Sequence, residues 1–359
     1  MNKRIGMLTF HRTTNFGSAL QTYGLYKKIR DLGYECEVID YRCPAIEQAE
    51  SLKVEWNIKK PKEIVKNILF QPTLNKKAKN IQKFSNTHMK ISQIYTPDNI
   101  KEANERYDKI IVGSDIVWGR DITNDDYTYF LDFLNNKEKK YAFASSVGYC
   151  TIREDESKLK TLLKEFSQIA VREEEAVKWV KQVSDMDAEW VCDPTMLLSA
   201  EEWKCIIPPK KISNNYVLVY FDNEKHECLN NAILYAKKHN KKVYFIQYGL
   251  PVRGVICKQP TSLEEFLGLL INADAVFTAS YHGILFSLYF HKKFMFYTRA
   301  HKSRVLSLAR RLELEEYCGD KKGMVEKIDI NYKNVDLKIK QFREESVSIL
   351  ADMLSEYEK

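Results

Sequence analysis

Strand-like and helix-like segments alternate along most of this 359-residue chain. Short apolar runs rich in β-branched residues are followed by longer runs with apolar residues at helical spacing, first at residues 4–10 and 17–31. This order is typical of parallel sheets, because parallel neighbours are joined by a crossover that is usually a helix. We therefore expect an α/β fold. The other expected strands are 35–41, 107–112, 142–147, 169–171, 190–192, 216–221, 242–246, 275–278 and 294–297.

The length is about twice that of a typical domain, and 44% hydrophobic residues can fill two cores. A polar, proline-bearing stretch at 208–215 separates two sets of βα segments. We expect an N-terminal Rossmann-like domain at 1–207 and a C-terminal one at 216–334. The charged amphipathic segment 335–359 should form a helix that packs back on the first domain.

The segment around His282 carries the strongest chemical signal. A strand-like run, Ala275 to Thr278, is followed by an apolar helical stretch, so Ser280 falls at the expected N-cap and His282 in the first turn. Free N–H groups and the positive end of the helix dipole favour anions there, and an imidazole so placed can donate a proton. The alternative is that His282 is only a cap or a packed polar residue.

Two other side chains follow expected strands, where ligand sites of α/β sheets gather. Asp115 comes after the strand ending at Val112, and it could act as a base, bind a sugar or cap a helix. Arg172 comes after Val171 and could bind carboxylate or phosphate with its guanidinium. The alternative for Arg172 is an ion pair with one of the acids at 173–175.

The first expected βα turn offers a second place for an anion. Asn15 can donate from its amide, Gly17 lets a ligand approach the backbone, and Ser18 begins the helix. The same residue types are also ordinary connector chemistry.

Residues 53–90 carry an unusual charge, with ten lysines against two acidic residues, while the whole chain has a net charge of +7. Apolar residues are interleaved at spacings compatible with one helical face. One interpretation is a solvated, lysine-rich insertion in the N-terminal domain. The other is docking at an anionic membrane surface. No nucleic-acid motif and no aromatic stacking platform accompany these lysines, so we expect no nucleic-acid partner.

No apolar run reaches the roughly 18 to 20 residues that cross a bilayer, and the N-terminus lacks the apolar region of a signal peptide. We expect a cytoplasmic protein, with peripheral binding at the inner face of the membrane as an extension of the lysine argument. Eight cysteines are scattered without a C-x-x-C pair, which favours reduced thiols and no metal site.

Several separate stretches, in this order, resemble the polysaccharide pyruvyl transferase family. They are 6–26 (GMLTFHRTTNFGSALQTYGLY), 111–118 (IVGSDIVW), 142–148 (AFASSVG), 169–174 (IAVREE), 192–198 (CDPTMLL) and the segment around His282 (TASYHG). Each string alone is weak, whereas their joint occurrence is specific. The sequence departs from the family pattern at Ile116, where glutamine is common, at Gly119, where asparagine is common, and at Cys192, where an aliphatic residue is common.

The resemblance implies a glycosyltransferase-B-like fold, in which two Rossmann-like domains face one another across a cleft. It implies a transferase that moves the enolpyruvyl unit of phosphoenolpyruvate onto a sugar of a surface-polysaccharide or lipid-linked glycan precursor, forming a cyclic ketal and releasing phosphate. Phosphoenolpyruvate would be a co-substrate, with no other cofactor. His282 would be the proton donor and Asp115 the second catalytic residue. The expected substrate-binding residues are Asn15, Gly17, Ser18, Ser114, Trp118, Arg172, Ser280, Gly283 and Arg304, with Trp118 stacking on a sugar ring.

Two alternatives remain open at this level. One is a glycosyltransferase that uses a nucleotide sugar on the same scaffold, because a fold does not choose a chemistry. The other is a non-catalytic protein that binds glycan or membrane. For the pyruvyl transferase reaction, Glu173 is a weaker candidate for the base, and His11 is the next candidate for the acid.

Overall fold

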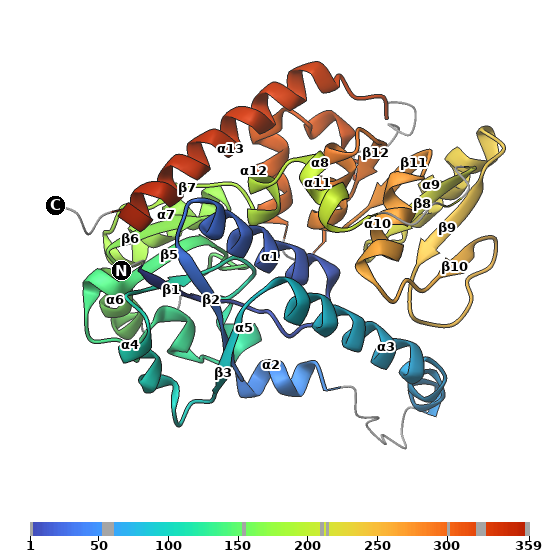
Figure 1. Ribbon diagram of the computed structural model, residues 1–359. Helices are drawn as coiled ribbons and strands as arrows, with labels where there is room; N and C mark the ends of the chain where they lie inside the picture. Colours follow the sequence, from blue (N-terminus) through green and yellow to red (C-terminus); the bar gives the residue numbers. More distant parts are fainter. Residues whose placement is uncertain are drawn as a thin grey trace. The chain divides into compact units, whose positions relative to one another are not determined.

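The computed structural model describes residues 3–51, 61–152, 156–208, 212, 215–299, 302–320 and 328–355, with only the backbone for 61–68. The chain divides into two compact units. The first comprises Met1–Ser51, Lys83–Leu198 and Leu337–Lys359, and the second comprises Leu52–Gln82 and Ser199–Asp336. Each unit is built on one parallel sheet flanked by helices (Figure 1), so the prediction of two Rossmann-like α/β units is confirmed.

The first unit has a seven-stranded sheet with the order β3-β2-β1-β4-β5-β6-β7. All neighbouring strands are parallel. The strands are β1 (Arg4–Leu8), β2 (Glu35–Tyr41), β3 (Ile91–Tyr95), β4 (Lys109–Val112), β5 (Lys140–Ser145), β6 (Gln168–Val171) and β7 (Glu189–Trp190). The central strands β4 and β5 are buried along their whole length, as expected for a parallel sheet covered on both faces. Strand β3 was not predicted; its sequence ISQIY mixes polar and apolar residues, and it lies at the sheet edge with four of its five residues at least partly exposed.

Helices connect these strands. They are α1 (Phe16–Asp31), α2 (Pro44–Ala49), α4 (Ala103–Arg106), α5 (Arg120–Thr123), α6 (Ser157–Lys164) and α7 (Glu174–Ser184). Short 3-10 turns occur at η1 (Ile100–Glu102), η2 (Tyr127–Phe130), η3 (Lys137–Lys139) and η4 (Pro194–Leu197). Helix α1 packs against η4, and Gly24 makes this possible because a Cβ there would lie 2.4 Å from the carbonyl oxygen of Pro194.

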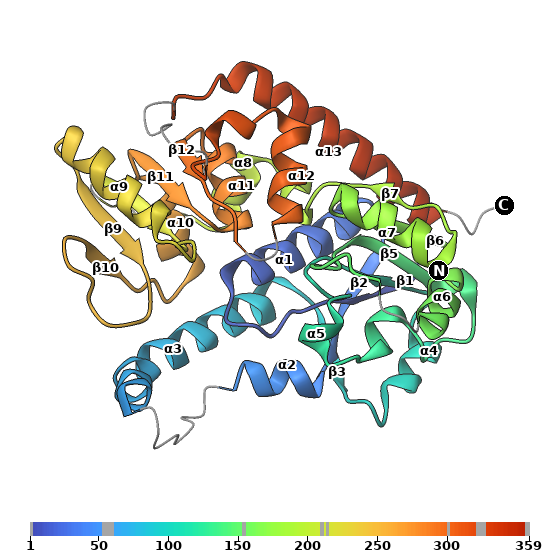
Figure 2. The ribbon, with the colours of Figure 1, turned by 180° about the vertical axis from the view of Figure 1, so that it is seen from behind.

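The second unit has a five-stranded parallel sheet with the order β10-β9-β8-β11-β12. The strands are β8 (Tyr216–Tyr220), β9 (Lys242–Ile246), β10 (Ile256–Lys258), β11 (Ala275–Thr278) and β12 (Lys293–Phe296). The helices are α8 (Ala200–Ile206), α9 (Glu227–Lys238), α10 (Leu263–Ile271), α11 (Tyr281–Tyr289) and α12 (Ser303–Leu312), followed by η5 (Glu315–Tyr317). Helix α9 packs across β8, β9 and β11, which can be followed in Figure 2. Helix α8 begins with a capping box in which Ser199 and Glu202 bond to each other's backbone N–H groups.

Two long helices, α3 (Pro61–His88) and α13 (Tyr332–Ser355), each contribute residues to both units. From Leu337 onward, α13 packs in the first unit. The ring of Phe342 lies 5.6 Å from that of Trp190, and Arg343 donates to the carbonyl oxygen of Leu198 at 3.3 Å. At the helix end, the buried ammonium of Lys109 donates to the carbonyl oxygen of Leu354 at 3.1 Å, where the helix dipole favours a cation.

The observed division corrects the expected domain boundaries in two places, because residues 52–82 and helix α8 belong to the second unit rather than the first. In α3, the amide of Asn80 donates to the carbonyl oxygen of Thr261 at 3.0 Å, and the ammonium of Lys77 lies 4.3 Å from the centre of the Tyr248 ring. In α8, the ring of Trp203 lies 5.5 Å from that of Phe286. These partners are far away in the sequence, so local patterning did not reveal them.

The lysine-rich segment is only partly described. Lys53, Lys59 and Lys60 lie outside the described residues, and the side chains of Lys62 and Lys66 are likewise not described. Among the remaining lysines, Lys77 is buried, whereas the others are exposed at 76, 79, 83 and 90. None of the described helices combines the length and apolar character needed to cross a membrane.

Candidate functional site

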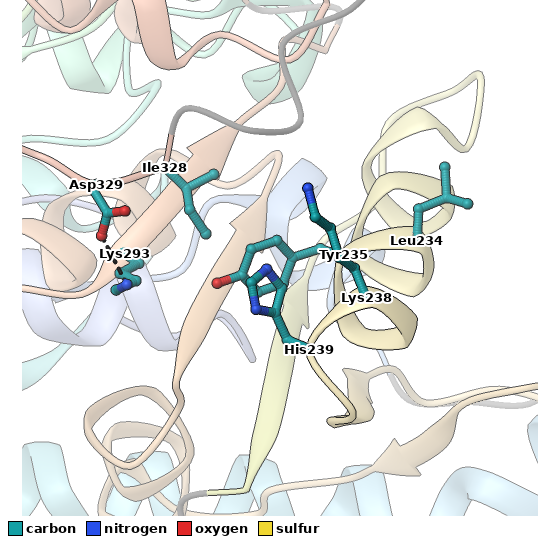
Figure 3. Close-up of a pocket in the computed structure, with 7 residues that line it drawn as sticks. All are labelled: Leu234, Tyr235, Lys238, His239, Lys293, Ile328 and Asp329. Atoms are coloured by element: carbon teal, nitrogen blue, oxygen red, sulfur yellow. Dashed lines mark ion pairs between the residues drawn. The ribbon is translucent and has the colours of Figure 1, made fainter.

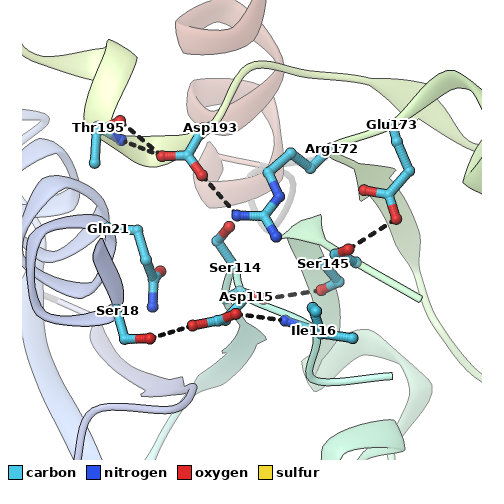
Figure 4. Close-up of polar contacts among 12 residues, drawn as sticks. Ser18, Gln21, Ser114, Asp115, Ile116, Ser145, Arg172, Glu173, Asp193 and Thr195 are labelled. Carbon is cyan, nitrogen blue, oxygen red and sulfur yellow. Dashed lines mark hydrogen bonds and ion pairs between the residues drawn. The ribbon is translucent and has the colours of Figure 1, made fainter. Parts of the chain in front are cut away.

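At the carboxyl ends of β4, β5 and β6, the first unit gathers polar side chains from distant segments (Figure 4). The hydroxyl of Ser18 in α1 donates to the Asp115 carboxylate, whose other oxygen accepts from the Ile116 N–H at 2.8 Å. The backbone N–H of Ser146 donates to the Asp115 carbonyl oxygen at 3.0 Å, and the Ser146 hydroxyl donates to Glu173 at 2.8 Å. This network links α1 with the ends of three strands, which is the edge of the sheet where α/β ligand sites form.

The backbone at this edge is held in uncommon conformations. Asp115 has a φ of 79° and Ala144, within β5, has a φ of 57°, although neither is glycine. The pairing of β5 with β6 is also irregular between Ala142 and Ser145. Such conformations cost on the order of 1–3 kcal/mol each and cluster at functional sites. The two strained positions therefore agree with the prediction that Asp115 lies in a functional region.

Three buried oxygens at this edge have no hydrogen-bond partner among the residues that the structure describes. They are Gln21 Oε1, Ser114 Oγ and Glu173 Oε2, and none of the three side chains is exposed. Leaving such a group unsatisfied costs about 1–3 kcal/mol, so buried water would stabilise it. Ser114 was predicted as a binding residue, whereas Gln21 was missed. The sequence signal that could have marked Gln21 is a polar side chain on the face of α1 that is buried in the structure.

Arg172 corrects the prediction of an anion-binding arginine at the mouth of the domain. Its Nη1 lies 2.7 Å from Asp193 Oδ2, and neither side chain is exposed. Asp193 Oδ1 in turn accepts from the N–H of Thr195 at 2.9 Å and from its hydroxyl at 2.8 Å (Figure 4). The alternative was an ion pair with one of the acids at 173–175, and the ion pair observed is with Asp193. Arg172 ties the end of β6 to the turn η4.

Trp118 corrects the prediction of a sugar-stacking side chain. It is 1% exposed, its indole N–H donates to the carbonyl oxygen of Tyr129 at 2.8 Å, and its ring is stacked on Phe130 at 5.3 Å. The ring centroid of Phe166 lies 5.8 Å from that of Trp118, edge-on. Trp118 is therefore a core residue, because the aromatic cluster around it leaves no face for a ligand.

The first βα turn behaves as a helix cap. Asn15 is the N-cap of α1, and its side-chain oxygen accepts from the Gly17 N–H at 2.8 Å. The Gly17 N–H is thus engaged within the turn, as the connector interpretation expects, and an approach of ligand to this backbone stays a prediction. Ser18 is buried and serves the network through Asp115.

In the second unit, His282 lies where the sequence predicted it, in the first turn of α11 after β11. The Ser280 hydroxyl oxygen accepts from the Gly283 N–H at 3.2 Å and so caps the helix. His282 is buried, and its ring meets that of Tyr281 edge-on at 5.6 Å. The guanidinium of Arg304 in α12 lies 5.7 Å from the centre of the same Tyr281 ring. An imidazole, an arginine and a helix N-terminus therefore share one edge of this sheet, which suits an anion.

Gly283 corrects a further prediction, since it is required for packing rather than for contact with a ligand. A Cβ there would lie 2.3 Å from Thr278 Oγ1 and 3.1 Å from a carbon of the Tyr220 ring. Thr278 cannot yield easily, because its hydroxyl bonds to the Tyr220 carbonyl oxygen and accepts from the Ser280 N–H.

We expect Gly283→Ala to lower the melting temperature, with a loss of about 1–3 kcal/mol from overpacking. Thermal unfolding measures this. In a Thr278→Ala background the hydroxyl that the new Cβ would clash with is absent. Gly283→Ala should therefore lose less stability there than in the parent protein. A Gly283→Ala variant that melts like the parent would contradict the packing role.

His11, the second candidate for the acid, is paired elsewhere. Its Nε2 lies 3.0 Å from Asp40 Oδ1, and both residues are buried. Burial raises the pKa of Asp40, but hydrogen bonds from His11 and Arg42 outweigh it and hold this pKa well below its usual range. This arrangement is a structural ion-pair cluster at the end of β2.

A cavity of about 340 Å³ lies in the second unit between α9 and the start of β12 (Figure 3). It is lined by Leu234, Tyr235, Lys238, His239, Lys293, Ile328 and Asp329, with Lys293 and Asp329 forming a 2.8 Å ion pair. Lys293 begins β12, so the cavity lies at the amino edge of the parallel sheet, away from His282. None of the predicted site residues lines it. Among the described residues, no group of three or more His, Cys, Asp or Glu is placed to hold a metal ion.

Two parallel-sheet units with polar and basic side chains at the carboxyl ends of their strands define a two-domain α/β protein of the kind whose ligand sites form at those ends. A family model described as polysaccharide pyruvyl transferase matches residues 15–301, which include residues of both units. The chain therefore belongs to the polysaccharide pyruvyl transferase family.

Solved structures with a similar backbone span the whole chain at low identity. One is Arabidopsis thaliana UGT89C1 complexed with UDP-L-rhamnose, with a TM-score of 0.48, 10% identity, and coverage of 99% of this chain and 100% of that chain. Another is UDP-N-acetylglucosamine 2-epimerase from Rickettsia bellii, with a TM-score of 0.47, 10% identity, and coverage of 100% and 99%. Because these scores lie below 0.5, neither likeness carries an argument about function. A search of functionally curated proteins finds no significant match.

Proposed function

We propose that this protein transfers the enolpyruvyl unit of phosphoenolpyruvate to a sugar of a glycan precursor, forming a cyclic pyruvate ketal and releasing phosphate. The observation that carries the proposal is the family match over residues 15–301, which takes in Asp115 of the first unit and His282 of the second. Phosphoenolpyruvate is a co-substrate here, and the reaction requires no further cofactor.

The reaction balances without an oxidant or reductant. A proton adds to the methylene carbon of the donor, which becomes a methyl group, and positive charge develops at the neighbouring carbon. Two sugar hydroxyl oxygens bond to that carbon in turn, and the bond from it to the phosphate oxygen breaks. One of the two hydroxyl protons replaces the proton spent on the methyl group, and the other leaves with phosphate. The chain must therefore supply a proton donor, a proton acceptor and groups that hold anions.

The residues at the two sheet edges suit these separate tasks. In the second unit, His282 is the proposed proton donor, and Arg304 near Tyr281 is the proposed anion contact. In the first unit, Asp115 is the proposed proton acceptor for a sugar hydroxyl. Its carboxylate is oriented by Ser18 and by the Ile116 N–H, as a base must be oriented to act.

The test is a reaction of the purified protein with phosphoenolpyruvate and a panel of glycosides that each present two neighbouring hydroxyls. Phosphate release should depend on both substrates, and the product should gain the mass of pyruvic acid minus water. A glycoside panel in which one of the two hydroxyls is methylated is the matched control, because it cannot close the ketal. Release of a nucleotide from a nucleotide sugar, with no phosphate from phosphoenolpyruvate, would instead identify a glycosyltransferase.

Binding to an anionic membrane surface is a separate part of the proposal, motivated by the lysine-rich segment 53–90. Its exposed lysines within the described residues include Lys76, Lys79 and Lys83. A lysine near anionic headgroups contributes about 1 kcal/mol, and salt screens this attraction.

We expect co-sedimentation with anionic vesicles at low salt and weaker binding at high salt. Changing Lys76, Lys79 and Lys83 to glutamine should reduce binding, whereas the same change at three exposed lysines elsewhere, 178, 237 and 340, should reduce it less. Equal sedimentation with neutral and anionic vesicles, or none with either, would exclude electrostatic docking.

A further inference from the structure

Tyr149 is an exposed aromatic side chain in the loop that follows β5 in the first unit. Its side chain is 44% exposed, whereas the predicted stacking residue Trp118 is 1% exposed. A single exposed aromatic ring is common on protein surfaces and means little by itself. Tyr149 is a candidate for ligand contact because of its position after β5 and because the neighbouring loop residues are held by hydrogen bonds.

The near end of this loop is fixed by hydrogen bonds. The Val147 N–H donates to Glu173 Oε1 at 3.1 Å, so a buried carboxylate holds the loop where it leaves the strand. The Tyr149 N–H then donates to the Val147 carbonyl oxygen at 3.0 Å, across Gly148 with a φ of 75°. This is a γ-turn with positive φ, a conformation that side chains rarely adopt and glycine accepts.

The residues that follow Tyr149 directly are fixed as well. Cys150 packs against the hydrophobic core of the unit, and the Thr151 carbonyl oxygen accepts from the indole N–H of Trp179 at 3.3 Å. Tyr149 therefore projects from a segment whose neighbours are tied down on both sides. A side chain presented in this way loses little freedom when a ligand binds against it, which favours affinity.

The chemistry of the same edge suits a hydroxyl-rich ligand. Ser146, three residues before Tyr149, bonds through its backbone to Asp115 and Trp118, so the Tyr149 Cα lies within about 11 Å of the Ser146 Cα. Asp115, whose carbonyl oxygen accepts from the Ser146 N–H, is only partly buried and offers its carboxylate to a ligand hydroxyl. An exposed aromatic ring at the same sheet edge as a partly exposed carboxylate matches a sugar, which offers C–H groups on one face and hydroxyls at its edge.

We propose that Tyr149 is the aromatic platform on which the ring of the acceptor sugar packs. This inference rests on the proposed function, since it takes the acceptor to be a sugar bound at the carboxyl edge of the first sheet. Tyr149 is a specificity-determining residue that contacts the acceptor and takes no part in proton transfer. It occupies the role that the sequence assigned to Trp118.

The test compares Tyr149→Ala and Tyr149→Phe with Ile152→Ala, a matched control at another exposed apolar residue of the same loop. In Tyr149→Ala the acceptor KM should rise about tenfold, the equivalent of about 1.4 kcal/mol for a lost aromatic contact, with donor KM and kcat unchanged. Tyr149→Phe and Ile152→Ala should behave like the parent. Melting temperatures check that each loop remains folded, and Tyr149→Leu replaces the alanine variant if that variant unfolds.

Saturation-transfer NMR of a glycoside acceptor with the protein gives a second readout that needs no turnover. The sugar ring protons should receive saturation from the parent and from Tyr149→Phe, and much less from Tyr149→Ala. If the acceptor KM and the NMR response are both unchanged in Tyr149→Ala, Tyr149 is not the platform. The proposed function would still stand in that case, provided that the parent protein forms the ketal. A parent protein that forms no ketal would instead overturn the proposed function, whatever Tyr149 does.

Discussion

Replacing His282 with glutamine should lower turnover by about 10² to 10⁴, the usual contribution of a positioned acid or base, while the fold and much of the donor affinity remain. The side chain lies in the first turn of α11, beyond the carboxyl end of β11, where the free N–H groups and dipole of the helix favour an anion. Arg304 approaches the same Tyr281 ring that His282 contacts. A donor anion held there would bring its methylene carbon to the imidazole.

The measurement is phosphate release with donor and acceptor in excess, with donor affinity measured separately by calorimetry. His291→Gln is the matched control, because this exposed histidine follows the opposite end of the same helix and pairs with Asp336 at 3.0 Å. It should change turnover little. If His282→Gln turns over within about threefold of the parent while the circular dichroism is unchanged, His282 is a packing residue and the proton comes from another group.

Replacing Arg172 with methionine should destabilise the protein by about 3–5 kcal/mol, the cost of leaving one partner of a buried ion pair uncompensated. Asp193 would be left buried without its cationic partner, and its hydrogen bonds from Thr195 do not replace the guanidinium. Because Asp193 also caps η4, the damage should reach the turn against which α1 packs.

Denaturant unfolding of Arg172→Met, Asp193→Asn and the double variant measures this coupling. Asparagine keeps an oxygen for Thr195 but removes the charge, so the double variant should recover part of the loss seen in Arg172→Met. An Arg172→Met variant as stable as the parent, but with a raised donor KM, would restore the original hypothesis that Arg172 binds the donor.

The sequence alone predicted the strands and helices well wherever their signals are local. The strand Ala275–Thr278 was predicted with the bounds observed, and α11 begins after Ser280, as its N-cap chemistry required. Periodicity and capping depend on residues within one or two turns, so a single segment contains the information. The joint occurrence of the family strings also identified the family without a structure.

What only the tertiary structure decided is which polar and aromatic residues are exposed, and which are committed to partners. Arg172 finds Asp193 21 residues later, and Trp118 is enclosed by Phe130 and Phe166. In α3, Lys77 and Asn80 contact residues of the second unit. Tyr149, in the loop after β5, is exposed, and no motif marked it. Exposure is a property of packing between distant segments. A residue's type and its neighbours in the sequence determine which element it forms, but the segments that fold against that element determine whether a ligand can reach it.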